Sequence, residues 1–223
     1  MYFSRFAARG TASTSRAVVT LAVVVVLAGC SSLWSGGGSK PVPGDLGANV
    51  AVLGVRQAWT SRVGGLVGMP MEVHTAGHLV TLASADGVVV SIDARTGGDV
   101  WRANLGEPLS AGVGSEGKAA AVISRGNELV VLDAGRERWR HAMGAQVFTP
   151  PLVAGGRVFV LSADRAISAF DAVTGRKLWT QQRPGEALVL RQAGVLRPVG
   201  DTLVVGLSGR LVGLNPDNGR VRW

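Results

Sequence analysis

The sequence predicts an all-β protein, a β-propeller of four-stranded antiparallel blades. About four of these blades are present. Two observations lead to this fold class: one short phrase occurs four times, and five of the six tryptophans recur about every forty residues. A repeat of that length with one tryptophan per unit is typical of propeller blades. The copies begin and end at Asp93 and Trp101, Asp133 and Trp139, Asp171 and Trp179, and Asn215 and Trp223, and Trp59 precedes them.

The third unit shows the expected blade most clearly. Its β-branched and apolar runs end at turn residues, and none keeps a helical period, so each run predicts a strand. The connections have the length of hairpins, which makes the unit an antiparallel meander. The predicted strands cover 148–153, 157–162, 166–170 and 177–181, and the blades 69–105, 109–143, 147–183 and 188–223.

The repeated phrase has a structural purpose. Asp93, Asp171 and Asn215 can each accept backbone N–H groups of the following residues, and Gly97, Gly175 and Gly219 provide the positive φ that completes a tight loop. The loop then brings the tryptophan onto the outermost strand, where its indole can pack against the neighbouring blade. The second copy is shorter and lacks Thr-Gly, so its turn is tighter, with Gly135 as its permissive residue.

Residues 50–62 predict a strand that carries Trp59 but lacks the three strands that should precede it. In a propeller such a strand joins the last blade and closes the ring. With it, the predicted propeller domain covers residues 50–223.

The first 49 residues predict export and lipidation. Arg5, Arg9 and Arg16 precede an apolar stretch, 17–28, that is too short to span a membrane and is typical of a signal peptide, here 1–29. The Leu-Ala-Gly-Cys sequence at its end is a lipobox, which makes Cys30, the single cysteine, the lipidated residue. Residues 30–49 form a flexible tether. Ser31, where an Asp would retain a lipoprotein at the inner membrane, favours the periplasmic face of the outer membrane.

Composition argues against nucleic-acid binding and against catalysis. Removal of the leader lowers the formal charge from +8 to +5, and the remaining cations are scattered through turns as a solvated rim. His74, His78 and His141 have no metal-ligand spacing, so we expect no metal. No catalytic residue and no cofactor is predicted.

The Ala-x-Asp-x-x-Thr-Gly-x-x-x-Trp phrase, best preserved in residues 169–179, resembles the pyrroloquinoline-quinone-like repeat. Two families carry it: quinoprotein dehydrogenases, and BamB-like lipoproteins of the outer-membrane β-barrel assembly machinery. The enzymes use adjacent cysteines under the cofactor, whereas this chain has a single cysteine. The resemblance is therefore closer to the BamB-like scaffolds, over residues 27–223. Because those propellers have eight blades, it implies that half of the ring is missing from this sequence.

The resemblance also implies a partner. BamB-like proteins use a Leu-x-Leu-Arg segment to bind the POTRA domains of BamA, and Leu188, Leu190 and Arg191 match it. Spacing alone favours an ordinary core strand, and it is the resemblance that favours the partner segment. The implied function is a non-enzymatic scaffold that assists the insertion of β-barrel proteins and contacts unfolded outer-membrane proteins. A periplasmic PQQ-dependent dehydrogenase-like propeller is the alternative, and a generic peptide-binding propeller is a third possibility.

Overall fold

The computed structural model describes residues 55–65, 68–69, 72–183, 194–207 and 209–223, together with Gly44 and Gly47. The chain divides into two units, Met1–Gly54 and Val55–Trp223. Every strand of the described part belongs to the second unit, so the blades are formed by residues of Val55–Trp223.

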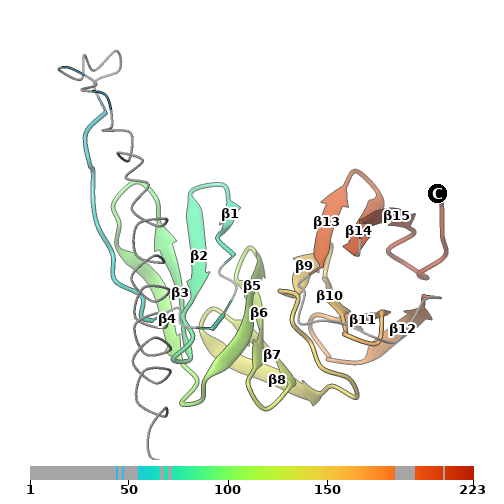
Figure 1. Cartoon of the computed structure of the whole chain (residues 1–223). Helices are drawn as coiled ribbons and strands as arrows, with labels where there is room; N and C mark the ends of the chain where they lie inside the picture. Colours follow the sequence, from blue (N-terminus) through green and yellow to red (C-terminus); the bar gives the residue numbers. More distant parts are fainter. Residues whose placement is uncertain are drawn as a thin grey trace, which may run out of the picture. The chain divides into compact units, whose positions relative to one another are not determined.

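The strands form four antiparallel sheets, each made of strands consecutive in sequence (Figure 1). This confirms the all-β propeller architecture. Blade 1 contains β1 (His74–Ala76), β2 (Leu79–Ala83), β3 (Val88–Asp93) and β4 (Asp99–Asn104). Blade 2 contains β5 (Leu109–Glu116), β6 (Ala119–Ser124), β7 (Glu128–Asp133) and β8 (Arg136–Ala142). Blade 3 contains β9 (Leu152–Ala154), β10 (Arg157–Leu161), β11 (Ala166–Asp171) and β12 (Lys177–Gln182). Blade 4 contains β13 (Val195–Val199), β14 (Thr202–Leu207) and β15 (Arg210–Leu214).

Blade 4 differs from the expected four strands. In the described residues it has three, and an isolated bridge between Leu214 and Val221 stands where a fourth strand would pair. All described strands lie within the blade ranges expected from the sequence.

The apolar core lies between the blades. One cluster joins residues of blades 1 and 2, a second joins blades 2 and 3, and a third joins blades 3 and 4. The middle strands of blades 2 and 3 are covered on both faces, which explains why their sequences are nearly continuous apolar runs such as Leu129–Leu132. The outer strands β4, β8 and β12 have exposed polar residues, because their outer edge meets solvent.

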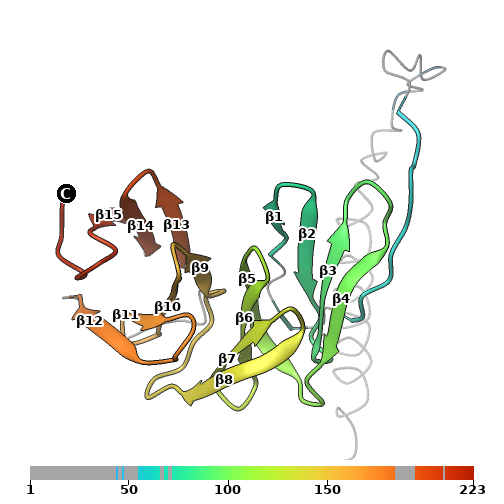
Figure 2. The same cartoon turned by 180° about the vertical axis from the view of Figure 1, so that it is seen from behind.

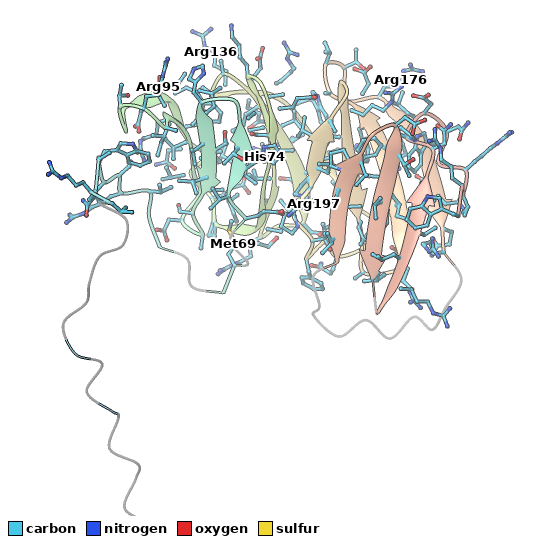
Figure 3. The ribbon with its side chains drawn as sticks, turned by 90° about the horizontal axis from the view of Figure 1, so that it is seen from above. Met69, His74, Arg95, Arg136, Arg176 and Arg197 are labelled. Atoms are coloured by element: carbon cyan, nitrogen blue, oxygen red, sulfur yellow. The ribbon has the colours of Figure 1, made fainter. Side chains whose placement is uncertain are left out.

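Each blade has two unlike edges. The hairpin edge carries the loops between first and second strands and between third and fourth strands, and backbone bonds tie these loops together: Ala94 N–H to His78 O, Ala134 to Lys118 and Ala172 to Gly156. The connector edge carries the loops between second and third strands and the connections from blade to blade. The positions of the labelled residues show this division: Arg95, Arg136 and Arg176 stand along the upper edge of Figure 3, and Met69 lies toward the lower one.

The long copies of the repeated phrase form one kind of turn. The side-chain oxygens of Asp93, Asp171 and Asn215 accept the N–H of the residue two positions ahead, at 2.8, 3.0 and 2.8 Å. The N–H groups of the three glycines close the loop onto the carbonyl of that first residue. The φ angles of the glycines, Gly97, Gly175 and Gly219, are +74°, +72° and +73°.

The short second copy forms a two-residue hairpin between Asp133 and Arg136. Ala134 and Gly135 both have positive φ, 48° and 82°, which is the backbone of a type I′ turn. This hairpin connects the two strands, and the second copy of the phrase is two residues shorter than the other three.

Each of four tryptophans lies against the turn glycine of the next blade. A methyl group built on Gly97 would be 2.5 Å from Cγ of Trp59, and the corresponding distances are 3.2 Å for Gly135 and Trp101, 2.8 Å for Gly175 and Trp139, and 2.6 Å for Gly219 and Trp179. The glycine therefore has two purposes, a positive φ and a flat surface on which an indole can lie.

Three of these indoles also donate a hydrogen bond into the next blade. Nε1 of Trp59, Trp139 and Trp179 bonds the carbonyls of Ala94, Ala172 and Pro216 at 2.7, 3.0 and 3.0 Å. No such bond from Trp101 is found in the described part of the chain. Its neighbour is the short turn of blade 2, which presents a different backbone to the indole.

Trp59 occupies on blade 1 the position that Trp101 occupies on blade 2. Residues 55–65 nevertheless form no strand, so the closing strand expected at 50–62 remains a prediction. Trp223 is the least covered motif tryptophan. It is 61% exposed, and its ring contacts Gly213 of its own blade.

Candidate interaction surface

The predicted partner segment, with Leu188, Leu190 and Arg191, lies outside the described residues. Its described flanks are Arg183, which follows β12, and Gly194, which precedes β13. Both belong to the connector edge of blades 3 and 4, because β12 leads away from the hairpin edge and β13 leads back to it.

Polar contacts fix both flanks. The N–H of Gly194 donates to Thr149 Oγ1 at 2.8 Å, and the side-chain amide of Gln182 donates to Asp164 O at 2.7 Å. The Nη1 atom of Arg183 is buried and has no hydrogen-bond partner among the residues that the structure describes. The two hydrogen bonds hold Gln182 and Gly194 at the connector edge.

Cys30, the predicted lipidation site, also lies outside the described residues. Among the residues that the structure describes, no helix is long and apolar enough to cross a membrane.

The innermost strands bring together a polar group from three blades. Oγ of Ser115, in β5, lies 3.3 Å from Nδ1 of His74, in β1, and Arg197, in β13, forms an ion pair with Glu72, which precedes β1 (Figure 3). Partial burial lowers the pKa of His74, which favours the neutral form of its ring. The described ranges contain no group of three or more His, Cys, Asp or Glu side chains arranged to hold a metal ion.

The predicted basic rim is partly neutralised. Arg95 forms an ion pair with Asp93 at 2.7 Å, and this bond holds the pKa of the Asp93 carboxyl far below its usual range. Arg138 similarly pairs with Asp133 and Arg222 with Asp201, both at 2.7 Å. Three of the rim arginines thus form separate ion pairs, each with an acidic residue close to it in the fold.

A cleft of about 280 Å³ opens between blades 3 and 4. Its floor is apolar, and Leu152, Phe159 and Leu203 supply it. Its walls come from the hairpin edge and are formed by Glu116, Ala154, Gly155, Arg157, Pro198, Gly200, Asp201, Thr202 and Pro216. The two inner strands that frame it, β9 and β13, stand side by side in both views (Figures 1 and 2).

Arg157 is the central polar group of this cleft. Its Nη2 pairs with Asp217 at 2.7 Å and its Nη1 donates to Gly155 O at 3.2 Å, whereas its Nε is buried and has no hydrogen-bond partner among the described residues. The carboxylate of Glu116 accepts the N–H groups of Gly155 and Gly156, at 3.1 and 3.3 Å, and so contacts the hairpin that precedes Arg157.

None of the cleft residues was predicted from the sequence. They come from three blades, and each belongs to a strand end or a hairpin whose local pattern is that of ordinary structure. An arginine at the start of a buried strand, as at Arg157, was the one available signal, because a long cation next to Val158 and Phe159 needs partners from elsewhere in the fold.

The chain matches a known family and known relatives. The family model described as outer membrane protein assembly factor BamB matches residues 85–223. The protein of that name from Bordetella pertussis is 34% identical over 210 residues, which is 93% of this chain and 54% of the relative. The one from Burkholderia pseudomallei is 37% identical and covers 92% and 54%. The chain thus spans about half the length of these curated relatives.

Solved structures agree on the fold. The crystal structure of BamB from Moraxella catarrhalis matches with a TM-score of 0.58 and 22% identity, over 74% of this chain and 55% of that one. A europium-containing methanol dehydrogenase matches with a TM-score of 0.55 and 16% identity, over 75% and 43%. At these identities both likenesses concern the propeller alone. The family model decides between the assembly factor and the dehydrogenase, because it covers more than half of the sequence. The chain belongs to the family of the outer membrane protein assembly factor BamB.

Proposed function

We propose that this protein is a non-enzymatic scaffold of the outer-membrane β-barrel assembly machinery, held by a lipid on Cys30 at the periplasmic face of the outer membrane. It binds the POTRA domains of BamA through the segment that contains Leu188, Leu190 and Arg191, and it assists the assembly and insertion of β-barrel proteins.

The observation that carries this proposal is the family match, because the curated relatives are named as outer-membrane protein assembly factors. Two features of the chain support it. The lipobox at Cys30 accounts for the single cysteine. The Leu-x-Leu-Arg residues themselves lie outside the described residues, and their described flanks, Arg183 and Gly194, lie at the connector edge.

The interface is tested by capturing the purified BamA POTRA region with the full-length lipoprotein. Replacing Leu188, Leu190 and Arg191 together with Ala removes two apolar anchors and one cation, so we expect the affinity to fall by roughly a hundredfold. The measurement is a titration in detergent, with melting temperatures recorded to verify folding.

The matched control is the triple variant Val173→Ala, Val221→Ala, Arg176→Ala, which removes the same kinds of side chain from the exposed hairpin edge. It should bind as the unmodified protein does. Equal affinity of the unmodified protein and the Leu188, Leu190, Arg191 variant would reject this segment as the interface. Oxidation of alcohols by the full-length protein supplied with pyrroloquinoline quinone and calcium would reject the scaffold in favour of the dehydrogenase.

A further inference from the structure

We propose that Glu72, His74, Ser115 and Arg197 form a pH-sensitive latch at the inner strands of the propeller, in which protonation of the His74 ring opens the ion pair that joins blade 4 to blade 1. Such a latch acts between blades, so it goes beyond the proposed function and is independent of the BamA interface. Figure 3 shows His74 and Arg197 on the inner strands of different blades.

The ion pair connects two blades that are distant in sequence. Nη2 of Arg197, in β13, pairs with Oε1 of Glu72, which precedes β1. His74 stands two residues before the last residue of β1, as Arg197 does in β13, so the two residues lie at the same level of their inner strands. The backbone N–H of Glu72 also donates to Gly112 O of β5 at 3.3 Å. Glu72 is therefore held by blade 2 and by blade 4.

The His74 ring contacts a buried hydroxyl group. Oγ of Ser115, in β5, lies 3.3 Å from Nδ1 of His74, and Ser115 is 2% exposed. A neutral imidazole keeps one ring nitrogen as an acceptor, which the Ser115 hydroxyl can fill, whereas both nitrogens of a protonated ring are donors. Protonation of His74 therefore forces this buried hydroxyl to change from donor to acceptor.

The charges that act on the ring come from three segments. Among the residues that the structure describes, these are Glu72 before β1, Glu116 at the end of β5, and Arg197 in β13. The neighbouring strand β2 places Thr81 opposite His74 and contains no charged residue. Burial lowers the pKa of His74 below its ordinary value of 6.5, and Arg197 lowers it as well, whereas Glu72 and Glu116 raise it. The neutral ring is thus the form that fits the closed latch.

A proton on His74 changes the balance of charge at Glu72. It places a second cation near Arg197, and the two cations then compete for one carboxylate. The side chain of Arg197 is 53% exposed, so its guanidinium can exchange the ion pair for water at little cost. Because the pKa of His74 is lowered in the folded state, the stability that the neutral ring contributes is complete above 6.5 and is lost as the pH falls through the folded pKa.

Native-state hydrogen exchange of the full-length lipoprotein in detergent tests the latch. The protection of amides in β13 and β14 is compared at about pH 7.5 and about pH 5.5, after correction for the intrinsic exchange rates. We expect it to fall about threefold at the lower pH, as for the loss of one partly exposed ion pair. Amides of β10 and β11, in blade 3, should keep their protection, because no residue of these strands belongs to the latch.

Two variants remove the pH response in opposite ways. His74→Gln keeps the ion pair but cannot take up the proton, so β13 and β14 should stay protected at both pH values. Glu72→Gln removes the carboxylate, so their protection should be about threefold lower at both pH values. His78→Gln is the matched control, because His78 is an exposed histidine in the hairpin that follows β1. It should respond to pH as the unmodified protein does.

Equal protection of β13 and β14 at the two pH values in the unmodified protein would overturn the proposal. So would a pH response that persists in His74→Gln or in Glu72→Gln, because the proton or the carboxylate would then lie elsewhere. An equal loss of protection in blade 3 would also overturn it, since the whole propeller and not one contact would respond. BamA takes no part in these measurements, so such a failure would leave the proposed function standing.

Discussion

At the scale of single residues, the repeated phrase acts through a few hydrogen bonds. Oδ1 of Asp171 accepts the N–H groups of Val173 and Thr174 and the hydroxyl of Thr174, at 3.0, 2.7 and 3.0 Å. These bonds favour the ionised carboxylate and lower the pKa of Asp171. Blade 4 uses Asn215 in the same place, so an amide oxygen is sufficient to form the turn and the charge adds pH dependence.

Replacement Asp171→Asn is therefore expected to change how stability depends on pH. Because the pKa of Asp171 is lowered in the folded state, its carboxylate stabilises the fold fully above the unfolded pKa, about 4. This contribution is lost as the pH falls further, through the folded pKa. Melting temperatures of the unmodified protein and the variant should thus differ most near pH 6 and converge toward pH 2. A difference that is constant over this range would contradict the assignment.

Gly219 must adopt a positive φ and must also leave room for the indole of Trp179. Substitutions at two different glycines can separate these requirements. Its φ is +73°, the same as that of Gly209, but a methyl group on Gly219 would be 2.6 Å from Cε3 of Trp179, whereas nothing lies within 4 Å of one on Gly209. Both replacements by Ala should cost about 1–2 kcal/mol for the left-handed backbone. Gly219→Ala should cost about 1–3 kcal/mol more, because the indole must shift.

Urea unfolding of the two glycine variants measures this difference. Equal losses of stability in Gly209→Ala and Gly219→Ala would mean that the tryptophan does not need the bare glycine surface.

At the scale of elements, blades are joined by the contact of one tryptophan with the next turn. Trp179 leaves β12 of blade 3, lies on Gly219 and donates to Pro216 O of blade 4. Its ring also contacts Phe159. The recurring tryptophan thus links an outer strand, the floor of the cleft and the following blade.

We expect Trp179→Ala to destabilise the protein by about 3–5 kcal/mol, because it leaves a cavity between two blades and removes one interblade hydrogen bond. Chemical denaturation is the measurement. An unchanged midpoint for Trp179→Ala would show that the contact contributes nothing to stability.

At the scale of the whole molecule, the meander gives the propeller two edges with different chemistry. The connector edge holds the flanks of the predicted BamA segment, and the hairpin edge holds the cleft. All blades run in the same sense, so every loop of one kind lies at the same edge.

The strand pattern and the repeated turn were predictable because they are local. A carboxylate or amide two residues from its donor, and a glycine four residues from the start, form the same loop wherever they occur. The spacing of the tryptophans also predicted that they join blades. It did not identify the glycine as the surface on which the indole lies, since that glycine belongs to the next repeat.

The cleft and the axial polar groups were not predictable in this way. Arg197 pairs with Glu72 and Arg157 with Asp217 across separate blades, and no short-range pattern marks either pair. Such contacts depend on the angle and distance between sheets, which are set by the packing of three apolar clusters.

By itself the sequence determined the all-β repeat architecture, the turn chemistry at Asp93, Asp171 and Asn215, and the prediction of a lipid anchor at Cys30. These come from short-range hydrogen bonding, backbone preference and apolar periodicity, which a chain carries in its order of residues. Only the tertiary structure decided which glycine receives each tryptophan, where the edges lie, and that Arg157 of blade 3 pairs with Asp217 of blade 4 beside an apolar cleft. These features require residues distant in sequence to meet, and that is fixed only when the blades pack.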